Sequence, residues 1–144
     1  MTDFHETTVR VRYAETDQMG VVYHANHYVW FEIGRTEMLR SAGINYKEME
    51  TRDDCFIVVV ESSCRYLRPA RYDDVLRIRT RITDAKPRIL RFGYELLKDS
   101  DGELLATGET VHVICDKLGR PKSLPPRYRR LFGITNPGPD PTMN

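Results

Sequence analysis

The segment from about residues 24–27 to residue 42 constrains the fold most, because it predicts one long helix that is apolar on more than one side. It contains no proline, and Gly43, a residue that favours the position just after a helix, follows it. Gly34, a poor helix former, indicates that another backbone passes close by. The apolar surface is formed by Tyr28, Val29, Trp30, Phe31, Ile33, Met38, Leu39 and Ala42. Such a helix is covered by more than one layer of structure.

Alternation of apolar and polar side chains predicts one strand before this helix and several after it. The predicted strands are residues 7–13, 56–67, 75–83, 88–98 and 103–115. Residues 99–102, Asp-Ser-Asp-Gly, are a hairpin turn signal. Residues 45–54 have weak helical character, and residues 125–132 form a short closing helix. The order predicts an α+β fold in which a sheet packs on, and curls round, one central helix.

Two of these strands indicate which side chains face the core. The inward positions are Leu76, Ile78, Thr80 and Ile82 in one strand and Leu90, Phe92, Tyr94 and Leu96 in the next. The opposite face of the first strand carries Arg77, Arg79 and Arg81, which is most simply a solvated surface.

The length and charge of the chain favour one globular domain. Its 144 residues suit a single domain at residues 1–133 with a loose Pro-rich tail at 134–144. The 22 Lys and Arg nearly cancel the 21 Asp and Glu, so no long-range attraction to nucleic acid is expected. No apolar run reaches the roughly 18 residues of a membrane span, and no secretory leader is seen. The three cysteines form neither a disulfide framework nor a zinc ribbon, which favours a cytoplasmic protein.

Residues 13–35 read YAETDQMGVVYHANHYVWFEIGR. This run resembles the hotdog-fold acyl-CoA thioesterases of the 4-hydroxybenzoyl-CoA thioesterase type, above all the small bacterial enzymes associated with the Tol–Pal system. The matching positions include Tyr13, Asp17, Gly20, Val22, Tyr23, His24, Asn26, Trp30, Glu32 and Arg35. The chain departs at Glu15, where the family more often has Asp, and at His27, where Tyr is commoner. With later matches at residues 66–69, 70–73 and Gly108, the resemblance covers about residues 7–132.

The resemblance implies a fold, an activity and an assembly. The fold is an antiparallel sheet of about five to six strands wrapped around one long central helix. The activity is hydrolysis of acyl-CoA to free carboxylate and CoA, with no cofactor or metal, because CoA is part of the substrate. The site in such proteins lies between subunits that pair sheets edge to edge, so a homodimer or a homotetramer built as a dimer of dimers is implied. An acyl-carrier protein or a lipid-synthesis enzyme is a possible partner.

The chemistry of a thioester explains why Asp17 is the central candidate. A thiolate leaves readily because thiols ionise near pKa ~8.5, so the reaction needs mainly an attacking oxygen and donors for the developing oxyanion. Asp17 could attack and form a mixed anhydride, or could accept a proton from an attacking water. Unpaired N–H groups at the helix N-terminus, at Tyr23 and His24, are predicted to polarise the carbonyl. In another context Asp17 would be a turn or helix-capping aspartate.

Other candidate site residues have more than one interpretation. His24 could donate through its ring, act only through its backbone, or have no role in the reaction. Tyr13, at a predicted strand end, could hydrogen-bond a catalytic side chain or pack in the core. The candidates for binding the phosphates of CoA are Arg65, Arg68, Arg71, Arg88 and Arg91.

Rival functions remain. His24 and His27 have a spacing that suits a metal, with Asp17 or His112 as a third ligand, but nothing in the sequence selects one. Residues 99–102 lack the full spacing of a calcium loop. A non-catalytic acyl-CoA-binding module on the same fold is disfavoured because Asp17 is retained. A hotdog dehydratase is disfavoured because its N-terminal pattern differs.

Overall fold

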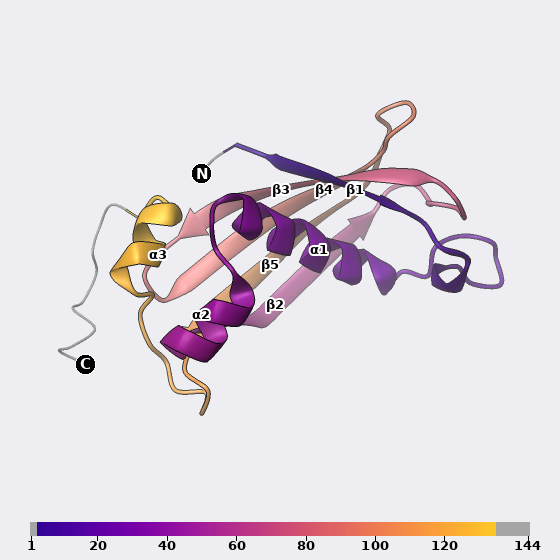
Figure 1. Ribbon diagram of the computed structural model, residues 1–144. Helices are drawn as coiled ribbons and strands as arrows, with labels where there is room; N and C mark the ends of the chain where they lie inside the picture. Colours follow the sequence, from indigo (N-terminus) through magenta and orange to yellow (C-terminus); the bar gives the residue numbers. More distant parts are fainter. Residues whose placement is uncertain (1–2, 135–144) are drawn as a thin grey trace.

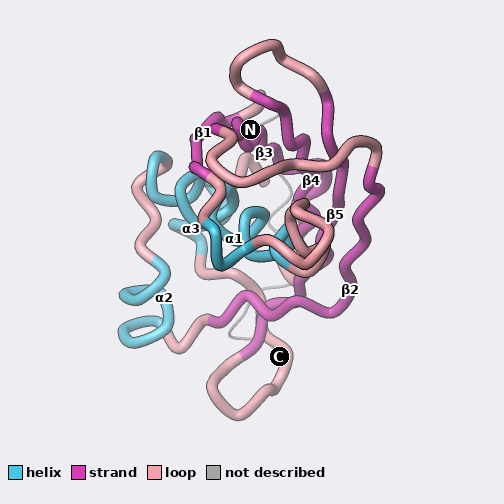
Figure 2. The backbone as a smooth tube through the Cα atoms, turned by 90° about the vertical axis from the view of Figure 1, so that its right-hand side faces the viewer, coloured by secondary structure: helices cyan, strands magenta, loops and turns pink. Residues whose placement is uncertain are grey.

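Five antiparallel strands form one sheet in the order β1-β3-β4-β5-β2 in the computed structural model, which describes residues 3–134. The strands are β1 (His5–Arg10), β2 (Phe56–Tyr66), β3 (Val75–Ala85), β4 (Ile89–Lys98) and β5 (Leu104–Cys115). The long helix α1 (Asn26–Ser41) lies along one face of this sheet (Figure 1). Seen along the helix, the strands curve round α1 (Figure 2). The predicted hotdog arrangement, a sheet wrapped around one central helix, is confirmed.

Close approach of α1 to β3 accounts for the glycine in the middle of the helix. A Cβ on Gly34 would lie 2.4 Å from Oγ1 of Thr80 and 2.7 Å from Cγ2 of Ile78. The predicted neighbour was a backbone, whereas the observed neighbours are side chains of β3. The helix is buried through His27, Trp30, Phe31, Gly34, Met38 and Leu39. Tyr28 and Val29, which were expected to add to the covered surface, are 36% and 45% exposed.

The four predicted strands after α1 are confirmed to within a few residues, and so are their inward faces. Every second residue is buried from Leu76 to Ile82 in β3 and from Leu90 to Leu96 in β4, as the alternation predicts. On the outer face, Arg79 forms ion pairs with Glu6 and Glu95 at 3.2 and 2.6 Å. The predicted solvated row of arginines is therefore a partly ion-paired surface.

The prediction that the first strand continues to residue 13 is wrong. Strand β1 ends at Arg10, and Tyr13–Glu15 form a single turn of 3-10 helix, η1. The carboxylate of Glu15 is buried and accepts the backbone N–H of Arg12 at 2.7 Å. This bond replaces strand pairing, so the chain turns away from the sheet before Tyr13.

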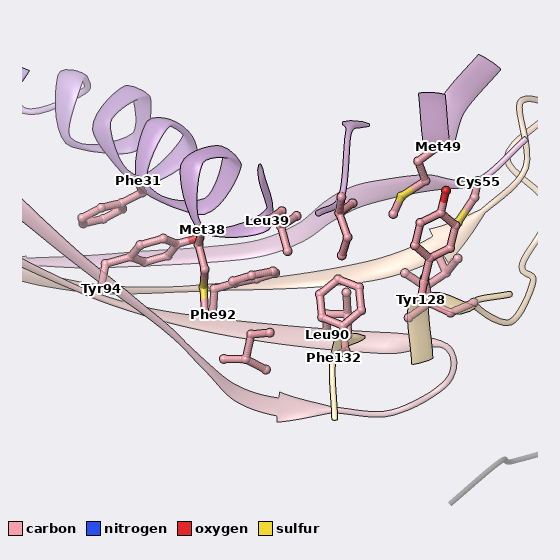
Figure 3. Packing of buried hydrophobic residues seen from close by; sticks show 14 residues of the cluster. Phe31, Met38, Leu39, Met49, Cys55, Leu90, Phe92, Tyr94, Tyr128 and Phe132 are labelled. Atoms are coloured by element: carbon pink, nitrogen blue, oxygen red, sulfur yellow. The ribbon is translucent and has the colours of Figure 1, made fainter. Parts of the chain in front are cut away.

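The core consists of two clusters along α1. Figure 3 shows the first, in which side chains of α1, including Phe31 and Leu39, pack over Phe92 and Tyr94 of β4. The rings of Phe31 and Tyr94 stack at 4.4 Å between centroids. The second cluster is made of Val11, Val22, Trp30, Ala70, Leu76, Ile78, Leu96, Leu105 and Ala106. Through Val22 and Ala70, this cluster anchors the loop before α1 and the segment that follows β2.

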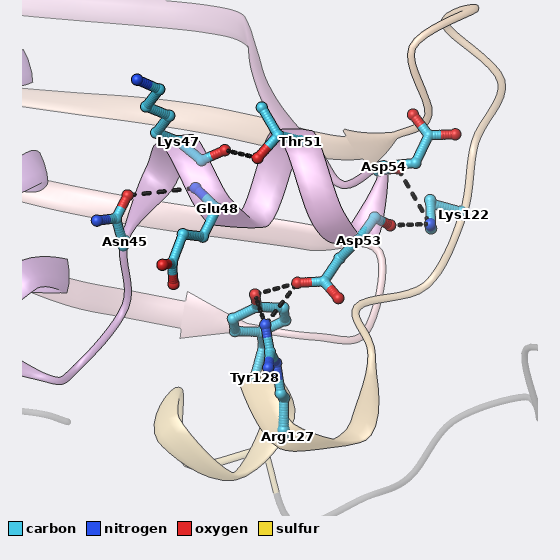
Figure 4. Close-up of polar contacts among 9 residues, drawn as sticks. All are labelled: Asn45, Lys47, Glu48, Thr51, Asp53, Asp54, Lys122, Arg127 and Tyr128. Carbon is cyan, nitrogen blue, oxygen red and sulfur yellow. Dashed lines mark hydrogen bonds and ion pairs between the residues drawn. The ribbon is translucent and has the colours of Figure 1, made fainter.

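Two short helices close the far end of the sheet. The weakly helical connection is α2 (Tyr46–Asp53), and the predicted closing helix is α3 (Pro126–Leu131). Figure 4 shows how polar contacts join them: the Asp53 carboxylate accepts from Arg127 at 2.6 Å and from the Tyr128 hydroxyl. The ammonium of Lys122 donates to the carbonyl oxygens of Asp53 and Asp54, both at 3.0 Å. These contacts hold α2 against α3 and the segment that follows β5.

The C-terminal tail predicted at 134–144 lies outside the described residues, except for Ile134, which packs against the first core cluster. Within the described part of the chain, no helix combines the length and apolarity that crossing a membrane requires.

Candidate active site

Asp17 sits in a tight loop immediately before α1. Residues Thr16 and Val22 pair across the loop, and the N–H of Asp17 donates to the Val21 carbonyl at 2.9 Å. The Asp17 carboxylate accepts the N–H of Met19 at 2.8 Å, and Gly20 adopts a φ of +78°, which suits glycine. Asp17 therefore stabilises the turn, and one of its carboxylate oxygens is occupied by this hydrogen bond.

The same loop forms one wall of a cavity of about 360 Å³, a size typical of small-ligand sites. A second wall is the start of α1, and a third is the segment that follows β2. The N–H of Val22 donates to the carbonyl of Ala70 at 2.8 Å and joins the first and third walls. The cavity is lined by Asp17, Val21, Val22, His24, His27, Tyr66, Leu67, Arg68, Pro69 and Ala70. Asp17 and His24, predicted from a linear motif, thus border one space.

The backbone amides at the helix start differ from the prediction at one position. The N–H of Tyr23 is used internally, since it donates to the Glu15 carbonyl at 2.9 Å. The side-chain amide of Asn26 donates to the same oxygen at 2.8 Å. Among residues 3–134, none accepts a hydrogen bond from the N–H of His24 or Ala25. The donors that remain for a ligand are therefore His24 and Ala25, not Tyr23.

Two tyrosines predicted at the site are not brought to the cavity. Tyr13 is 78% exposed and packs edge-on against Tyr72 with 5.6 Å between ring centroids. The alternative prediction that Tyr13 packs in the core is therefore wrong. The Tyr23 side chain is half-exposed, and its ring contacts the ring of His24 with 4.6 Å between the two centroids. Neither side chain lines the cavity.

Two other residues enter the site that the analysis of catalytic candidates left out. Tyr66, the last residue of β2, lines the cavity, and its hydroxyl donates to the His24 carbonyl at 3.3 Å. His27 is buried and also lines the cavity, with Nδ1 2.9 Å from the same carbonyl oxygen. Burial lowers the pKa of His27. A signal existed for both, because the motif departs at His27 and the later family-like stretch begins at Tyr66.

Of the five arginines predicted to bind phosphate, all within the described residues, Arg68 lines the cavity. Arg71 lies next to the cavity, because its backbone forms a β-bridge with the cavity-lining Val21. Arg65 lies on the opposite face of β2 and borders a separate hollow. Arg88 donates to the Ser123 hydroxyl at 3.3 Å, and Arg91 pairs with Glu109 at 3.2 Å. Of these five arginines, the fold places only Arg68 in the lining of the cavity.

The metal alternative gains no support from the arrangement. His112, one suggested third ligand, has no exposed surface and lies in the core, where its Nε2 is 2.8 Å from the Thr110 hydroxyl. In residues 3–134, no group of three or more His, Cys, Asp or Glu side chains is placed to hold a metal ion.

Comparison with known proteins identifies the family to which this chain belongs. The sequence model of the thioesterase-like superfamily matches residues 11–132, which include every residue that lines the cavity. The chain belongs to the thioesterase-like superfamily. Within it, the acyl-CoA thioester hydrolase YbgC of Escherichia coli O157:H7 is 37% identical over 118 residues, covering 81% of this chain and 87% of that protein. The acyl-CoA thioesterase YbgC of Haemophilus influenzae is 32% identical over 126 residues, covering 86% and 90%.

A solved structure from this group of folds agrees with the architecture. The DHNA-CoA thioesterase of Staphylococcus aureus superposes with a TM-score of 0.86 at 27% identity, covering 90% of this chain and 89% of that one. In this chain the family-like segment, the start of α1 and the cavity lie together.

Proposed function

We propose that this chain is an acyl-CoA thioesterase that hydrolyses the thioester of acyl-CoA to a free carboxylate and CoA. One observation carries the proposal: Asp17 lines the same cavity as His24, whose backbone N–H has no acceptor among residues 3–134. An attacking oxygen and an oxyanion donor are the two parts that thioester hydrolysis needs. The names of the relatives at 32% and 37% identity support the same reaction class.

Two routes for Asp17 fit this geometry. As a nucleophile, its carboxylate adds to the carbonyl carbon, the C–S bond breaks, CoA leaves as a thiolate, and water hydrolyses the resulting anhydride. As a general base, Asp17 takes a proton from water while the water oxygen adds to the carbon. A single turnover in ¹⁸O-labelled water separates them, because only the anhydride route can leave label in Asp17.

Replacement of Asp17 tests the assignment. We expect Asp17→Asn to lower turnover of acyl-CoA by at least ~100-fold, measured as thiol release across a panel of acyl chains. Asp101→Asn is the matched control, because Asp101 accepts the N–H of Glu103 in a similar turn, at 3.0 Å, but lines no part of the cavity. Near-normal hydrolysis by Asp17→Asn would refute the role. Binding of CoA esters without turnover by the wild type would favour the non-catalytic module.

We further infer that two copies pair through β2, which lies at one edge of the sheet. Val58, Val59 and Val60 on this strand are 43%, 46% and 56% exposed, an unusual apolar run for an unpaired edge. Since β2 ends at the cavity-lining Tyr66, a second copy on this edge would border the site. A homodimer, or a tetramer of two such dimers, is the proposed assembly.

The reaction uses no resident cofactor or metal. A cytoplasmic location is supported by three free cysteines. An acyl-carrier protein or an enzyme of lipid synthesis is the proposed kind of physiological partner. Of the predicted phosphate contacts, Arg68 is favoured by its place in the cavity lining.

A further inference from the structure

Three donors contact the carbonyl oxygen of the peptide that joins His24 to Ala25. Its carbonyl oxygen accepts from the backbone N–H of His27 at 3.2 Å, from Nδ1 of His27 at 2.9 Å and from the Tyr66 hydroxyl at 3.3 Å. The N–H of the same peptide belongs to Ala25 and meets no acceptor within the described residues. In a trans peptide these two groups point in opposite directions, so the Ala25 N–H points away from the cavity-lining His27 and Tyr66. The bonds to the oxygen instead fix the backbone of His24, which lines the cavity and whose own N–H has no acceptor within the described residues.

The first side chain that holds this peptide is His27. Because a carbonyl oxygen only accepts, Nδ1 must carry the proton, which fixes the tautomer of the ring. His27 is 4% exposed, and its ring contacts the rings of Trp30 and Tyr66 at 5.4 and 4.7 Å between centroids. Burial lowers its pKa, which keeps the imidazole neutral at physiological pH. This burial and these two contacts leave the ring little freedom to turn its donor away.

The second side chain is Tyr66, which reaches the peptide from the end of β2. Its ring stands edge-on to the rings of both His24 and His27, at interplanar angles of 88° and 85°. Partial burial, followed by its contact with Cys64, raises the pKa of Tyr66 to about 12, so the hydroxyl keeps its proton and can donate. Tyr66 therefore links the sheet to the helix N-terminus at the cavity wall.

We propose that His27 and Tyr66 are positioning residues for thioester hydrolysis, which hold the His24 carbonyl and so fix the backbone from which the His24 N–H binds the thioester oxygen. This inference rests on the proposed function. The fixed His24 amide then stabilises the negative charge that develops as the carbonyl is attacked. Neither side chain touches the reacting atoms in this role.

Three variants test the roles of the two donors. His27→Phe keeps an aromatic ring without a donor, His27→Asn offers an amide N–H near the position of Nδ1, and Tyr66→Phe removes only the hydroxyl. We expect His27→Phe and Tyr66→Phe to lower kcat about tenfold with KM changed by less than about twofold, and His27→Asn to recover most of kcat. Tyr72→Phe is the matched control, since Tyr72 is exposed and lines no part of the cavity. It should leave kcat unchanged.

Two analogues of acyl-CoA distinguish aiming of a donor from general support of the fold. A trifluoromethyl ketone in place of the thioester mimics the oxyanion, whereas a thioether lacks the oxygen. We expect Tyr66→Phe to weaken binding of the ketone by the same factor as kcat/KM and to leave binding of the thioether unchanged. Equal weakening of both analogues would overturn the inference, since it would indicate a purely structural role.

The outcomes also separate this inference from the proposed function. A wild-type protein that hydrolyses no thioester would refute the function itself. A wild type that hydrolyses acyl-CoA and is inactivated by Asp17→Asn, but keeps kcat in both His27→Phe and Tyr66→Phe, would refute only the positioning roles. If His27→Phe fails to fold, Tyr66→Phe decides, because the Tyr66 side chain is 45% exposed.

Discussion

At the scale of single residues, the most perturbed titrating group is His112, which has no exposed surface. Burial, then the charge of Arg35, lowers the pKa of His112 to about 3 from an ordinary value of 6.5. Between these two pH values the unfolded chain binds a proton at this residue that the folded chain does not. Stability is therefore fully present above pH 6.5 and falls as the pH decreases toward 3.

His112→Gln tests this linkage, because glutamine can keep a polar contact with Thr110 but does not titrate. Between pH 7 and pH 5 we expect the free energy of unfolding of the wild type to fall by about 2 kcal/mol more than that of the variant. Denaturant unfolding at the two pH values measures both. His27, whose pKa is also lowered, is present in both proteins and cancels. An equal fall in both proteins would contradict the assignment.

A second prediction for a single residue concerns Arg68, the predicted phosphate ligand that lines the cavity. We expect Arg68→Ala to lower kcat/KM for acyl-CoA roughly tenfold, mainly through KM, because a charge-assisted contact is lost. The effect should vanish with an acyl-pantetheine, which lacks the nucleotide phosphates. An equal loss on both substrates would show that Arg68 does not contact phosphate. Arg40→Ala, in an exposed ion pair at the other end of α1, is the control.

At the scale of elements, the packing of α1 on β3 depends on the missing side chain of Gly34. Gly34→Ala would raise helix propensity by about 1 kcal/mol, but its Cβ would lie 2.4 Å from Thr80 Oγ1. Overpacking of this kind costs about 1–3 kcal/mol, so we expect a net loss of stability. Adding Thr80→Ala removes the nearest atom and should recover part of that loss, measured by denaturant unfolding. A more stable single variant would mean that α1 can move away from β3 at little cost.

At the scale of the whole molecule, the free edge of β2 determines whether two copies can complete the site. Val60→Lys places a charge on the most exposed valine of this edge, and in a symmetric pair two such charges would meet. We expect sedimentation to show monomers and thioester hydrolysis to fall steeply. Leu118→Lys, at a 75% exposed position outside the strands, is the control. A fully active monomer, or a wild type that is monomeric, would contradict pairing through β2.

The sequence by itself determined the long helix and the strands that follow it. Helix α1 and strands β3 and β4 were predictable because the period of apolar residues reports directly which positions are buried. Asp17 and His24 were predictable because they lie in one short segment whose ends the loop must bring together.

Only the tertiary structure decided which groups remain free to act. The Tyr23 amide donates to the Glu15 carbonyl and is therefore not available to a ligand. Tyr13 faces solvent because the Glu15 carboxylate binds the Arg12 N–H and turns the chain away from the sheet. Tyr66 joins His24 across 42 positions of sequence through the register of β2. Such contacts depend on where distant segments meet in space, and a local pattern of residues carries no information about that.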